Sequence, residues 1–344
     1  MSFQITIQPS GHVFRAEPDE TILDAALREG VVLPYGCRNG ACGSCKGKLL
    51  EGAVSYIRNY QQSALSEAEK QIGMALFCSA RPQSDLVLES REINAVRDIP
   101  IKMLPCRVQK LDLLAHDVMA IYLKLPAAER LQFLAGQYID ILKDGKRRSF
   151  SMANAPHDDE FLQLHVRNII GGAFTEYVFN KMKVRDILRL EGPFGTFFLR
   201  EDSDKPIVLV GSGTGFAPIK AIIEHAFHVG TTRPMVMYWG ARTRADLYSP
   251  ELPEQWRAQH ANFRYVPVLS EALPADNWRG RTGLVHQAVL DDFSDLSAYQ
   301  VYACGAPVMV EAAHRDFTAS RGLADDEFFS DAFTFAAPAP AILP

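Results

Sequence analysis

Fifteen residues near the start of the chain, LPYGCRNGACGSCKG at 33–47, contain three cysteines and four glycines. Glycine adopts backbone conformations that other residues avoid, so a segment this rich in glycine favours a curled loop. Buried cysteines that only pack are scattered through a sequence, whereas these three thiols are concentrated in one place. The segment therefore predicts a loop that folds around a metal centre.

The spacing of the cysteines indicates which centre. Cys37, Cys42 and Cys45 follow the pattern C-x4-C-x2-C, and the next cysteine is Cys78 in MALFCSARP. This is the plant-type ligand set of a [2Fe–2S] cluster. The glycines allow backbone N–H groups to point at the sulfurs, which helps to set the reduction potential. A zinc site is the alternative, but it usually has two C-x2-C knuckles or regularly spaced histidines, and the sequence has neither. The two cysteines outside this set are Cys106 and Cys304.

The residues around the cysteines indicate a small α+β domain. In DETILDAALREG, Thr21 is a suitable N-cap and Gly30 a suitable C-terminal cap for a helix. Ser66 and Glu69 have the spacing of a capping box just before the segment that delivers Cys78. Strand-like segments lie at 3–7, 13–15, 48–51 and 86–89. We expect a β-grasp domain over 1–95, and this part resembles a plant-type ferredoxin.

The next hundred residues predict an antiparallel β-barrel. Pro100 and Pro105 mark a linker, and a single helical stretch is expected at 173–182. Segments with strand character recur at short intervals at 106–111, 118–125, 137–142, 147–153, 161–168 and 187–199. Six strands with one helix over 101–202 favour a closed six-stranded barrel.

Two segments of this barrel suit a phosphorylated, flat ligand such as a flavin. In RRSFSMAN, strand geometry puts Arg148 and Phe150 on one face and Ser149 and Ser151 on the other. A cation beside an aromatic ring fits such a ligand. A cross-strand pair without a binding role is the alternative.

The second segment, GGAFTEY, places glycines at the start of a helix, where unpaired N–H groups attract a pyrophosphate. Its residues of interest are Gly171, Gly172 and Thr175.

The remainder, 203–335, predicts a parallel α/β domain that binds a nucleotide. KPIVLVGSGTGFAPIKAIIEHA is a buried strand, a glycine turn and an amphipathic helix, and it lacks the lysine of an ATPase P-loop. Later strands are continuous apolar runs, and their ends at Gly240, Ser270 and Cys304 should lie at the ligand-binding edge of the sheet. The Ala/Pro-rich segment 336–344 is expected to be a disordered tail.

Composition excludes several classes. The 344 residues carry a formal net charge of −5, which gives no reason to expect nucleic acid. The first residues alternate like a strand and lack the features of a signal peptide. No apolar run approaches the roughly 18 residues of a membrane span. We therefore expect a cytoplasmic protein without a membrane partner.

Four short motifs, RSFS, GPFG, GSGTGFAP and CGAP, follow the cysteine domain in this order. Together they resemble the iron–sulfur flavoprotein NAD(P)H reductases of the ferredoxin–NADP reductase superfamily, and the resemblance extends to about Phe335. It implies a [2Fe–2S] cluster, FAD and a nicotinamide cofactor.

Within the family, the chain is most similar to the branch that reduces CDP-6-deoxy-Δ3,4-glucoseen. Four segments carry this likeness: TILDAALREG, FLAGQYIDI, RRSFSMANAP and DAFTF. That branch implies an iron–sulfur sugar dehydrase as electron acceptor. Reductase components of phenol, methane and aromatic-ring oxygenases share the same plan, so an oxygenase component is the alternative partner.

The resemblance also implies roles for individual residues. The flavin and its phosphates should contact Arg148, Phe150 and Ser151, with Ser149 in the same strand and Gly171, Gly172 and Thr175 at the pyrophosphate. The nicotinamide nucleotide should lie at Gly211, Gly213, Thr214 and Gly215. The contact between nicotinamide and flavin should involve Cys304, Gly305 and Pro307. Phe333 in DAF matches the aromatic residue that often covers the flavin in this superfamily, although it could simply pack against the last strand.

One departure from the family pattern bears on cofactor choice. Members that prefer NADPH often have an arginine after the serine that follows the third strand, whereas this chain has Glu271 there. A carboxylate repels a 2′-phosphate, which favours NADH, although Arg242 and Arg244 are nearby in the sequence.

These cofactors imply an electron-transfer enzyme. NADH gives up two electrons together, a [2Fe–2S] cluster accepts one at a time, and a flavin can do both. We expect transfer from NADH through FAD and the cluster to a protein acceptor. A ferredoxin-type carrier or redox sensor is the alternative from another class, but a carrier needs no nucleotide site. Reduction of free flavin without a partner would leave the cysteines unexplained.

Overall fold

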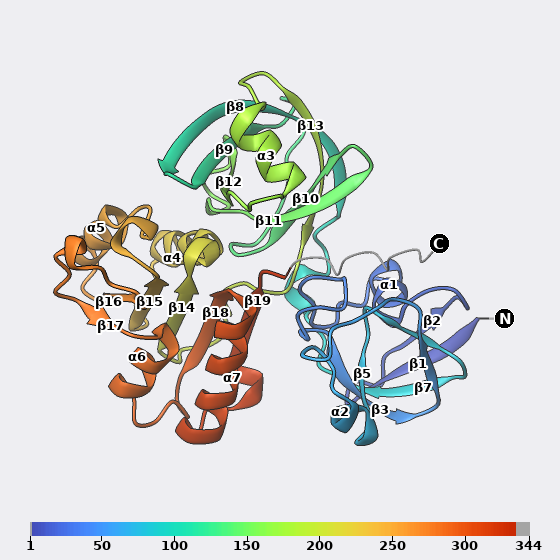
Figure 1. The fold of residues 1–344 in the computed structure, drawn as a ribbon. Helices are drawn as coiled ribbons and strands as arrows, with labels where there is room; N and C mark the ends of the chain where they lie inside the picture. The colour runs from blue at the N-terminus through green and yellow to red at the C-terminus, as the bar shows by residue number, and fades with distance from the viewer. Residues whose placement is uncertain (1, 335–344) are drawn as a thin grey trace, which may run out of the picture. The chain divides into compact units, whose positions relative to one another are not determined.

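The structure is a computed structural model that describes residues 2–334. The expected tail at 336–344, and Phe335 before it, lie outside the described residues. The described chain divides into two compact units, one of 2–99 with 331–334 and the other Pro100–Ser330. Three large sheets form the framework of these units (Figure 1). The expected combination of an α+β domain, an antiparallel barrel and a parallel α/β domain is confirmed.

The first unit contains the β-grasp domain. Its five-stranded sheet has the order β2-β1-β7-β3-β5, and β1 pairs antiparallel with β2 but parallel with β7. The strands of this sheet are β1 (Phe3–Gln8), β2 (Val13–Ala16), β3 (Lys46–Glu51), β5 (Met74–Leu76) and β7 (Leu86–Glu89). The other elements are α1 (Ile22–Arg28), α2 (Glu67–Gln71), η1 (Asn94–Val96) and the two-stranded sheet of β4 (Val54–Tyr56) and β6 (Ala80–Pro82).

The helix caps expected in this domain are formed, with one correction. The Oγ1 atom of Thr21 accepts the N–H of Asp24 over 3.1 Å, and Ser66 and Glu69 form a complete capping box. The C-cap of α1 is Glu29 and not Gly30. The helix therefore ends one residue earlier than the sequence pattern indicated, and Gly30 follows the C-cap with φ of +74°, the left-handed conformation that commonly closes a helix.

The second unit begins with the six-stranded barrel. Its strand order is β11-β10-β13-β8-β9-β12, and all neighbours are antiparallel. A bridge between Met152 and Leu164 joins the two outermost strands and closes the barrel. The elements are β8 (Lys102–Ala115), β9 (Val118–Lys124), β10 (Tyr138–Lys143), β11 (Lys146–Ser151), β12 (Leu162–Arg167), α3 (Ala173–Asn180) and β13 (Ile187–Phe194).

Pro105 belongs to the barrel and not to the linker. It lies inside β8, where it pairs with Arg189 of β13. Pairing of β8 with its other neighbour, β9, begins only at Arg107. Proline has no N–H to donate and is tolerated where a strand has a single neighbour, which explains the longer strand.

The parallel sheet of the second unit has the order β17-β16-β15-β14-β18-β19. Helices α6 and α7 pack against each other on one face, and α4 and α5 lie on the other (Figure 1). The strands are β14 (Ile207–Ser212), β15 (Met235–Ala241), β16 (Phe263–Leu269), β17 (Arg281–Thr282), β18 (Gln300–Gly305) and β19 (Phe328–Ala332). The α-helices are α4 (Phe216–His228), α5 (Glu251–Gln259), α6 (Val285–Asp292) and α7 (Pro307–Arg321), and the short 3-10 turns are η2 (Gly213–Gly215), η3 (Arg244–Asp246), η4 (Pro274–Asp276) and η5 (Asp325–Glu327). Within 2–334, no helix has both the length and the apolar character needed to cross a membrane.

Candidate functional site

The four cysteines predicted as cluster ligands come together in two pairs. The backbone N–H of Cys37 donates to the Sγ of Cys42 over 3.3 Å. The backbone N–H of Cys78 donates to the Sγ of Cys45 over 3.4 Å, although these residues are far apart in the sequence. In a [2Fe–2S] cluster with four cysteine ligands, each iron takes two thiolates. Two thiol pairs therefore fit a centre with two irons.

Within each pair, one thiol ionises more readily than the other. The hydrogen bond from Cys42 lowers the pKa of Cys37 to about 6, and nearby backbone N–H groups contribute. In the same way, the hydrogen bond from Cys45 lowers the pKa of Cys78. The pKa values of Cys42 and Cys45 are raised, because these thiols give their protons to the hydrogen bonds and are buried. Metal binding requires thiolates, so each pair has one member already disposed to ionise.

The spacing of the sulfurs does not suit a single zinc ion. Four thiolates around one zinc lie about 3.8 Å from one another, because each is about 2.3 Å from the ion. Within 2–334, the only group of three such ligand atoms that all lie within 4.8 Å of one another is His116, Asp117 and Asp246. Arg167 and Arg242 form ion pairs with the two aspartates of that group. The cysteines are spread more widely, as a cluster of two irons requires.

Gly40 allows the cluster loop to close on its neighbours. Its φ is +79°, and a Cβ atom there would lie 2.7 Å from the carbonyl oxygen of Asn59 and 2.9 Å from the Oγ of Ser79. The N–H of Gly40 also helps to lower the pKa of the Cys78 thiol. A side chain at this position would push the loop away from the segment that supplies Cys78, so the glycine is required by the close approach.

In the barrel, Arg148 and Phe150 lie on the same face of β11, as the alternation predicts. They stand opposite Ile141 and Ile139 of β10, which belong to the barrel core. The half-buried ring of Phe150 packs against Phe174, with ring centroids 5.2 Å apart, whereas Arg148 is exposed. Phe150 therefore contributes to packing, and contact of these two side chains with a flavin stays a prediction.

The two serines of β11 differ in their surroundings. Ser149 donates a hydrogen bond of 2.6 Å from its Oγ to the Oδ1 of Asp140, whereas Ser151 is buried at the end of the strand. Ser149 is therefore engaged within the barrel, and a contact with the flavin would have to share its hydroxyl with Asp140.

The predicted pyrophosphate turn lies at the start of α3. Gly172 is the N-cap residue, and the Oγ1 of Thr175 accepts the N–H of Ile169 over 3.1 Å and donates to carbonyl oxygens of the same turn. Gly171 has φ of +76° and open space where a side chain would be. Thr175 thus shapes the turn, and the helix N–H groups are the donors that an anion could reach.

In the α/β domain, two predicted motifs lie against each other at the carboxyl ends of β14 and β18. A Cβ atom at Gly215 would lie 2.1 Å from the carbonyl oxygen of Cys304, and one at Gly305 would lie 2.3 Å from the Oγ of Ser212. The same Oγ accepts the N–H of Ala306 over 2.9 Å. No side chain larger than hydrogen fits at either glycine, so the two turns form one surface at the edge where parallel sheets bind ligands.

The remaining predicted residues of this edge contribute unequally. Gly211 faces α4, where a Cβ atom would lie 3.1 Å from the Cδ1 of Ile219. Cys304 is fully buried, whereas Pro307 is exposed at the start of α7. Gly213 and Thr214 are half-buried in η2. Pro307 is thus more accessible than Cys304, and the role of Cys304 beside a nicotinamide stays a prediction.

Sequence reasoning missed the aromatic support beneath this turn. The Nε1 of Trp239 donates to the carbonyl oxygen of Gly213 over 3.0 Å, and its ring stacks on Phe216 with centroids 4.1 Å apart. Tyr248 packs edge-on against Trp239, and its hydroxyl lies 3.0 Å from the Nδ1 of His165 in the barrel. The run MVMYWGARTRADLY contains both aromatic residues, but no sequence signal links them to His165.

Phe333 and Glu271 lie outside the contacts described above. Phe333 follows the end of β19 and is half-buried, whereas Phe329 packs in the sheet against Tyr302 with ring centroids 4.9 Å apart. Glu271 is exposed after β16, and its N–H donates to the carbonyl oxygen of Arg242 over 2.8 Å.

These features define an electron-transfer oxidoreductase with an iron–sulfur domain, a flavin-binding barrel and a nicotinamide-nucleotide domain. The family models of the same three functions match the chain in this order. A 2Fe-2S iron-sulfur cluster binding domain covers residues 5–83, an oxidoreductase FAD-binding domain 105–199 and an oxidoreductase NAD-binding domain 209–315. The chain belongs to the iron–sulfur flavoprotein NAD(P)H reductases of the ferredoxin–NADP reductase superfamily.

Similar proteins match over nearly their whole length. The chain is 41% identical to the CDP-6-deoxy-L-threo-D-glycero-4-hexulose-3-dehydrase reductase of Yersinia pestis, over 97% of this chain and 99% of that protein. It is 36% identical to the phenol 2-monooxygenase reductase component of Pseudomonas sp., over 98% and 96% of the two chains. Among solved structures, an Amycolatopsis cytochrome P450 reductase is 34% identical and superposes with a TM-score of 0.78, over 97% of this chain and 100% of that one.

The burial of His165 predicts a specific pH dependence of stability. Burial, with a contribution from Lys220, lowers the pKa of His165 to about 3, compared with about 6.5 in an unfolded chain. Between these values the unfolded state binds a proton that the folded state does not, so stability falls as the pH drops from about 6.5 towards 3, by on the order of 1 kcal/mol per pH unit. His165→Gln should lose this part of the acid sensitivity, as measured by denaturant unfolding at pH 5 and 7.5.

Replacement of the exposed His116 by Gln is the matched control and should keep the wild-type pH dependence. If wild type and His165→Gln lose equal stability between the two pH values, the histidine is not buried in its neutral form.

Proposed function

We propose that this protein transfers electrons from NADH, through FAD and a [2Fe–2S] cluster, to an iron–sulfur dehydrase that acts on a CDP-6-deoxy-hexose. The nucleotide surface formed by Gly215 and Cys304 supports reduction by a nicotinamide cofactor, and the two thiol pairs support transfer through a cluster. The observation that favours this acceptor is the 41% identity to a CDP-hexulose dehydrase reductase over almost the whole of both chains.

We propose a set of binding residues for each of the three cofactors. Cys37, Cys42, Cys45 and Cys78 hold the cluster. When bound, the flavin takes two electrons from the nicotinamide and releases them singly, and the cluster carries one electron at a time. Arg148 and the N–H groups at the start of α3 neutralise the flavin phosphates, and Phe150 and Ser151 contact the ring. Gly211, Gly213, Thr214 and Gly215 cradle the nicotinamide nucleotide, and Gly305 and Pro307 border its reactive end together with Cys304.

A reductase component of an aromatic-ring or phenol-type oxygenase is the second candidate, because identities to such components reach 36% over nearly the whole chain. The two functions are distinguished by supplying the purified protein and NADH with either a CDP-6-deoxy-hexose dehydrase or a phenol hydroxylase component. Rapid NADH-dependent reduction of the dehydrase is expected, and reduction of the oxygenase component alone would favour the second candidate.

The carrier or redox-sensor alternative makes a different prediction for the protein alone. Its visible colour should not bleach on anaerobic addition of NADH, whereas a reductase should bleach within seconds. The chain has glycine at both positions where the two nucleotide turns meet, which favours a functional nucleotide site.

The proposed ligand set predicts the effect of Cys78→Ser. Loss of one thiolate should lower the iron content and the cluster absorbance, while FAD remains bound because its residues lie in the barrel. The control is Cys106→Ala, which removes a buried thiol of the barrel core and should leave the iron content unchanged. Two irons per chain in Cys78→Ser would contradict the ligand assignment, and loss of both cofactors would instead indicate misfolding.

The loop after β16 predicts a preference for NADH. Glu271 repels a 2′-phosphate, while Arg242 pairs with Asp246 and Arg244 donates to the carbonyl oxygen of Asp276. We expect a higher kcat/KM with NADH than with NADPH, and Glu271→Arg should narrow the difference. Glu311→Arg, on the exposed surface of α7, makes the same change of charge elsewhere and should leave the ratio unaltered.

If the wild-type enzyme prefers NADPH, the assignment of Glu271 is wrong. Arg242 or Arg244 would then become the more plausible ligand of the phosphate.

Phe333 is proposed to cover the flavin face that the nicotinamide must reach. Phe333→Ala should then change flavin fluorescence and the rate of anaerobic flavin reduction by NADH in stopped flow, with little change in melting. Phe329→Ala is the control, because truncation of a core phenylalanine typically costs about 3–5 kcal/mol of stability. A large drop in melting temperature with an unchanged reduction rate in Phe333→Ala would assign this ring to packing.

A further inference from the structure

The guanidinium group of Arg58 lies at the two chain segments that carry the cluster cysteines. Its Nη1 donates to the carbonyl oxygen of Cys78 over 3.1 Å and, by a longer and weaker contact of 3.4 Å, to that of Arg38. Arg38 directly follows Cys37, so one side chain spans the glycine-rich loop and the segment of the distant ligand. Both carbonyls are 20 residues away in sequence, and local chain geometry therefore does not impose these contacts.

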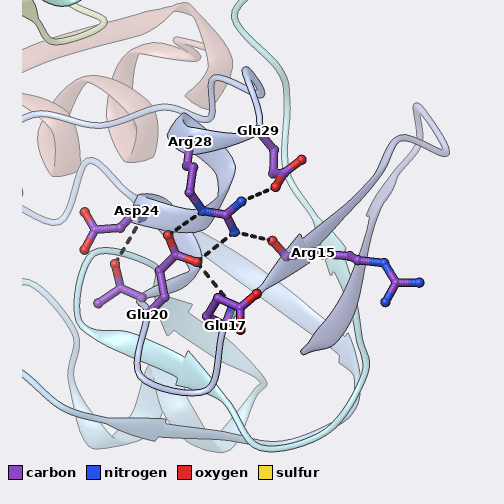
Figure 2. A network of polar contacts seen from close by, with 7 residues as sticks. Arg15, Glu17, Glu20, Asp24, Arg28 and Glu29 are labelled. Atoms are coloured by element: carbon purple, nitrogen blue, oxygen red, sulfur yellow. Dashed lines mark hydrogen bonds and ion pairs between the residues drawn. The ribbon is translucent and has the colours of Figure 1, made fainter. Parts of the chain in front are cut away.

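Asp24 holds this guanidinium in place. The Nη2 of Arg58 donates to the Oδ2 of Asp24 over 2.6 Å. Asp24, which is labelled in Figure 2, lies in the first turn of α1. Its N–H donates to the Oγ1 of Thr21 over 3.1 Å, which fixes its position. The planar fork of arginine can bind a carboxylate and backbone carbonyls at the same time, which the single ammonium group of lysine does less well.

The position of this cation matters for electron transfer because reduction adds one negative charge to a cluster. Net charge and hydrogen bonding around a cluster are among the factors that set its reduction potential. A fixed positive charge beside a ligand stabilises the reduced form more than the oxidised form. The side chain of Arg58 is 42% exposed, so solvent weakens this effect but does not abolish it.

We propose that Arg58 is a positioning residue of the iron–sulfur site, which joins the two ligand-bearing segments and raises the reduction potential of the cluster. This inference rests on the proposed assignment of the four cysteines. It assigns to Arg58 a role in setting how readily the cluster accepts an electron from the flavin.

Arg58→Gln tests the charge. In the full-length protein loaded with cofactors, the equilibrium constant for cluster reduction should fall roughly threefold to tenfold in an EPR-monitored redox titration, where tenfold corresponds to about 59 mV for one electron. Arg58→Lys keeps the positive charge but loses the planar guanidinium group. The reduction potential of its cluster should therefore stay close to that of the wild type. A change in the EPR line shape of Arg58→Lys would report the altered contact with the ligand segments.

Arg28 provides a matched control in the same domain. Its guanidinium also joins carboxylates to a backbone carbonyl, since it donates to Glu20, to Glu29 and to the carbonyl oxygen of Arg15 over 2.8 Å (Figure 2). Its partners contain no cysteine ligand. Arg28→Gln should therefore disturb the same domain, yet leave the potential of the cluster unchanged.

Asp24→Asn should shift the reduction potential in the opposite direction to Arg58→Gln. It also keeps the proposal testable if Arg58→Gln fails to incorporate its cluster. Removal of the carboxylate leaves the Arg58 charge uncompensated, so the potential should rise. An unchanged potential in both Arg58→Gln and Asp24→Asn, or equal shifts in Arg28→Gln and Arg58→Gln, would overturn the proposal. Iron analysis and the EPR signal of the wild-type protein distinguish failure of the cysteine assignment from failure of the role proposed for Arg58. Absence of a cluster in the wild-type protein would refute the cysteine assignment itself.

Discussion

The contact on which the nucleotide site depends is the close approach of Gly215 to the carbonyl oxygen of Cys304. Neighbouring parallel strands, β14 and β18, end side by side, and each is followed by a turn that must pass the other. A methyl group at Gly215 would lie 2.1 Å from that oxygen, so only glycine permits the approach. The Oγ of Ser212 also accepts the N–H of Ala306, which links the two turns by a hydrogen bond. The edge of the sheet thereby becomes a continuous backbone surface, at the place where parallel sheets bind their ligands.

Side chains of the α/β domain and of the barrel support this backbone surface. Trp239 fixes the carbonyl oxygen of Gly213, and Tyr248 links Trp239 to His165 of the barrel. Within the second unit, the nucleotide turn is therefore connected to a barrel strand through buried rings. Such rigid support suits a reductase, because electron transfer between two bound cofactors requires that they be held in a fixed relation.

The iron–sulfur domain brings four thiols from distant segments together, which is the arrangement that the proposed cluster requires. The glycine loop supplies three of them, and the segment after β5 supplies Cys78. Gly40 lets these segments meet without a side chain between them, and Arg58 connects their carbonyls to the helix α1 through Asp24. The pairing of Cys37 with Cys42 and of Cys45 with Cys78 is a product of this folding, since the sequence alone does not say which thiols become neighbours.

The sequence by itself determined the cluster type, the three-domain order and the family, because these depend on local patterns: ligand spacing, strand periodicity and glycine turns. It also predicted the caps at Thr21 and Ser66, which involve residues three positions apart. It placed the C-cap of α1 one residue too late, at Gly30 instead of Glu29, and it assigned Pro105 to a linker because it could not show how many neighbours the strand has. The tertiary structure alone brought Gly215 to Cys304, His165 to Tyr248 and Arg58 to Cys78. These contacts join residues that are 20 to 89 positions apart and depend on which strands become neighbours, and no local pattern encodes that choice.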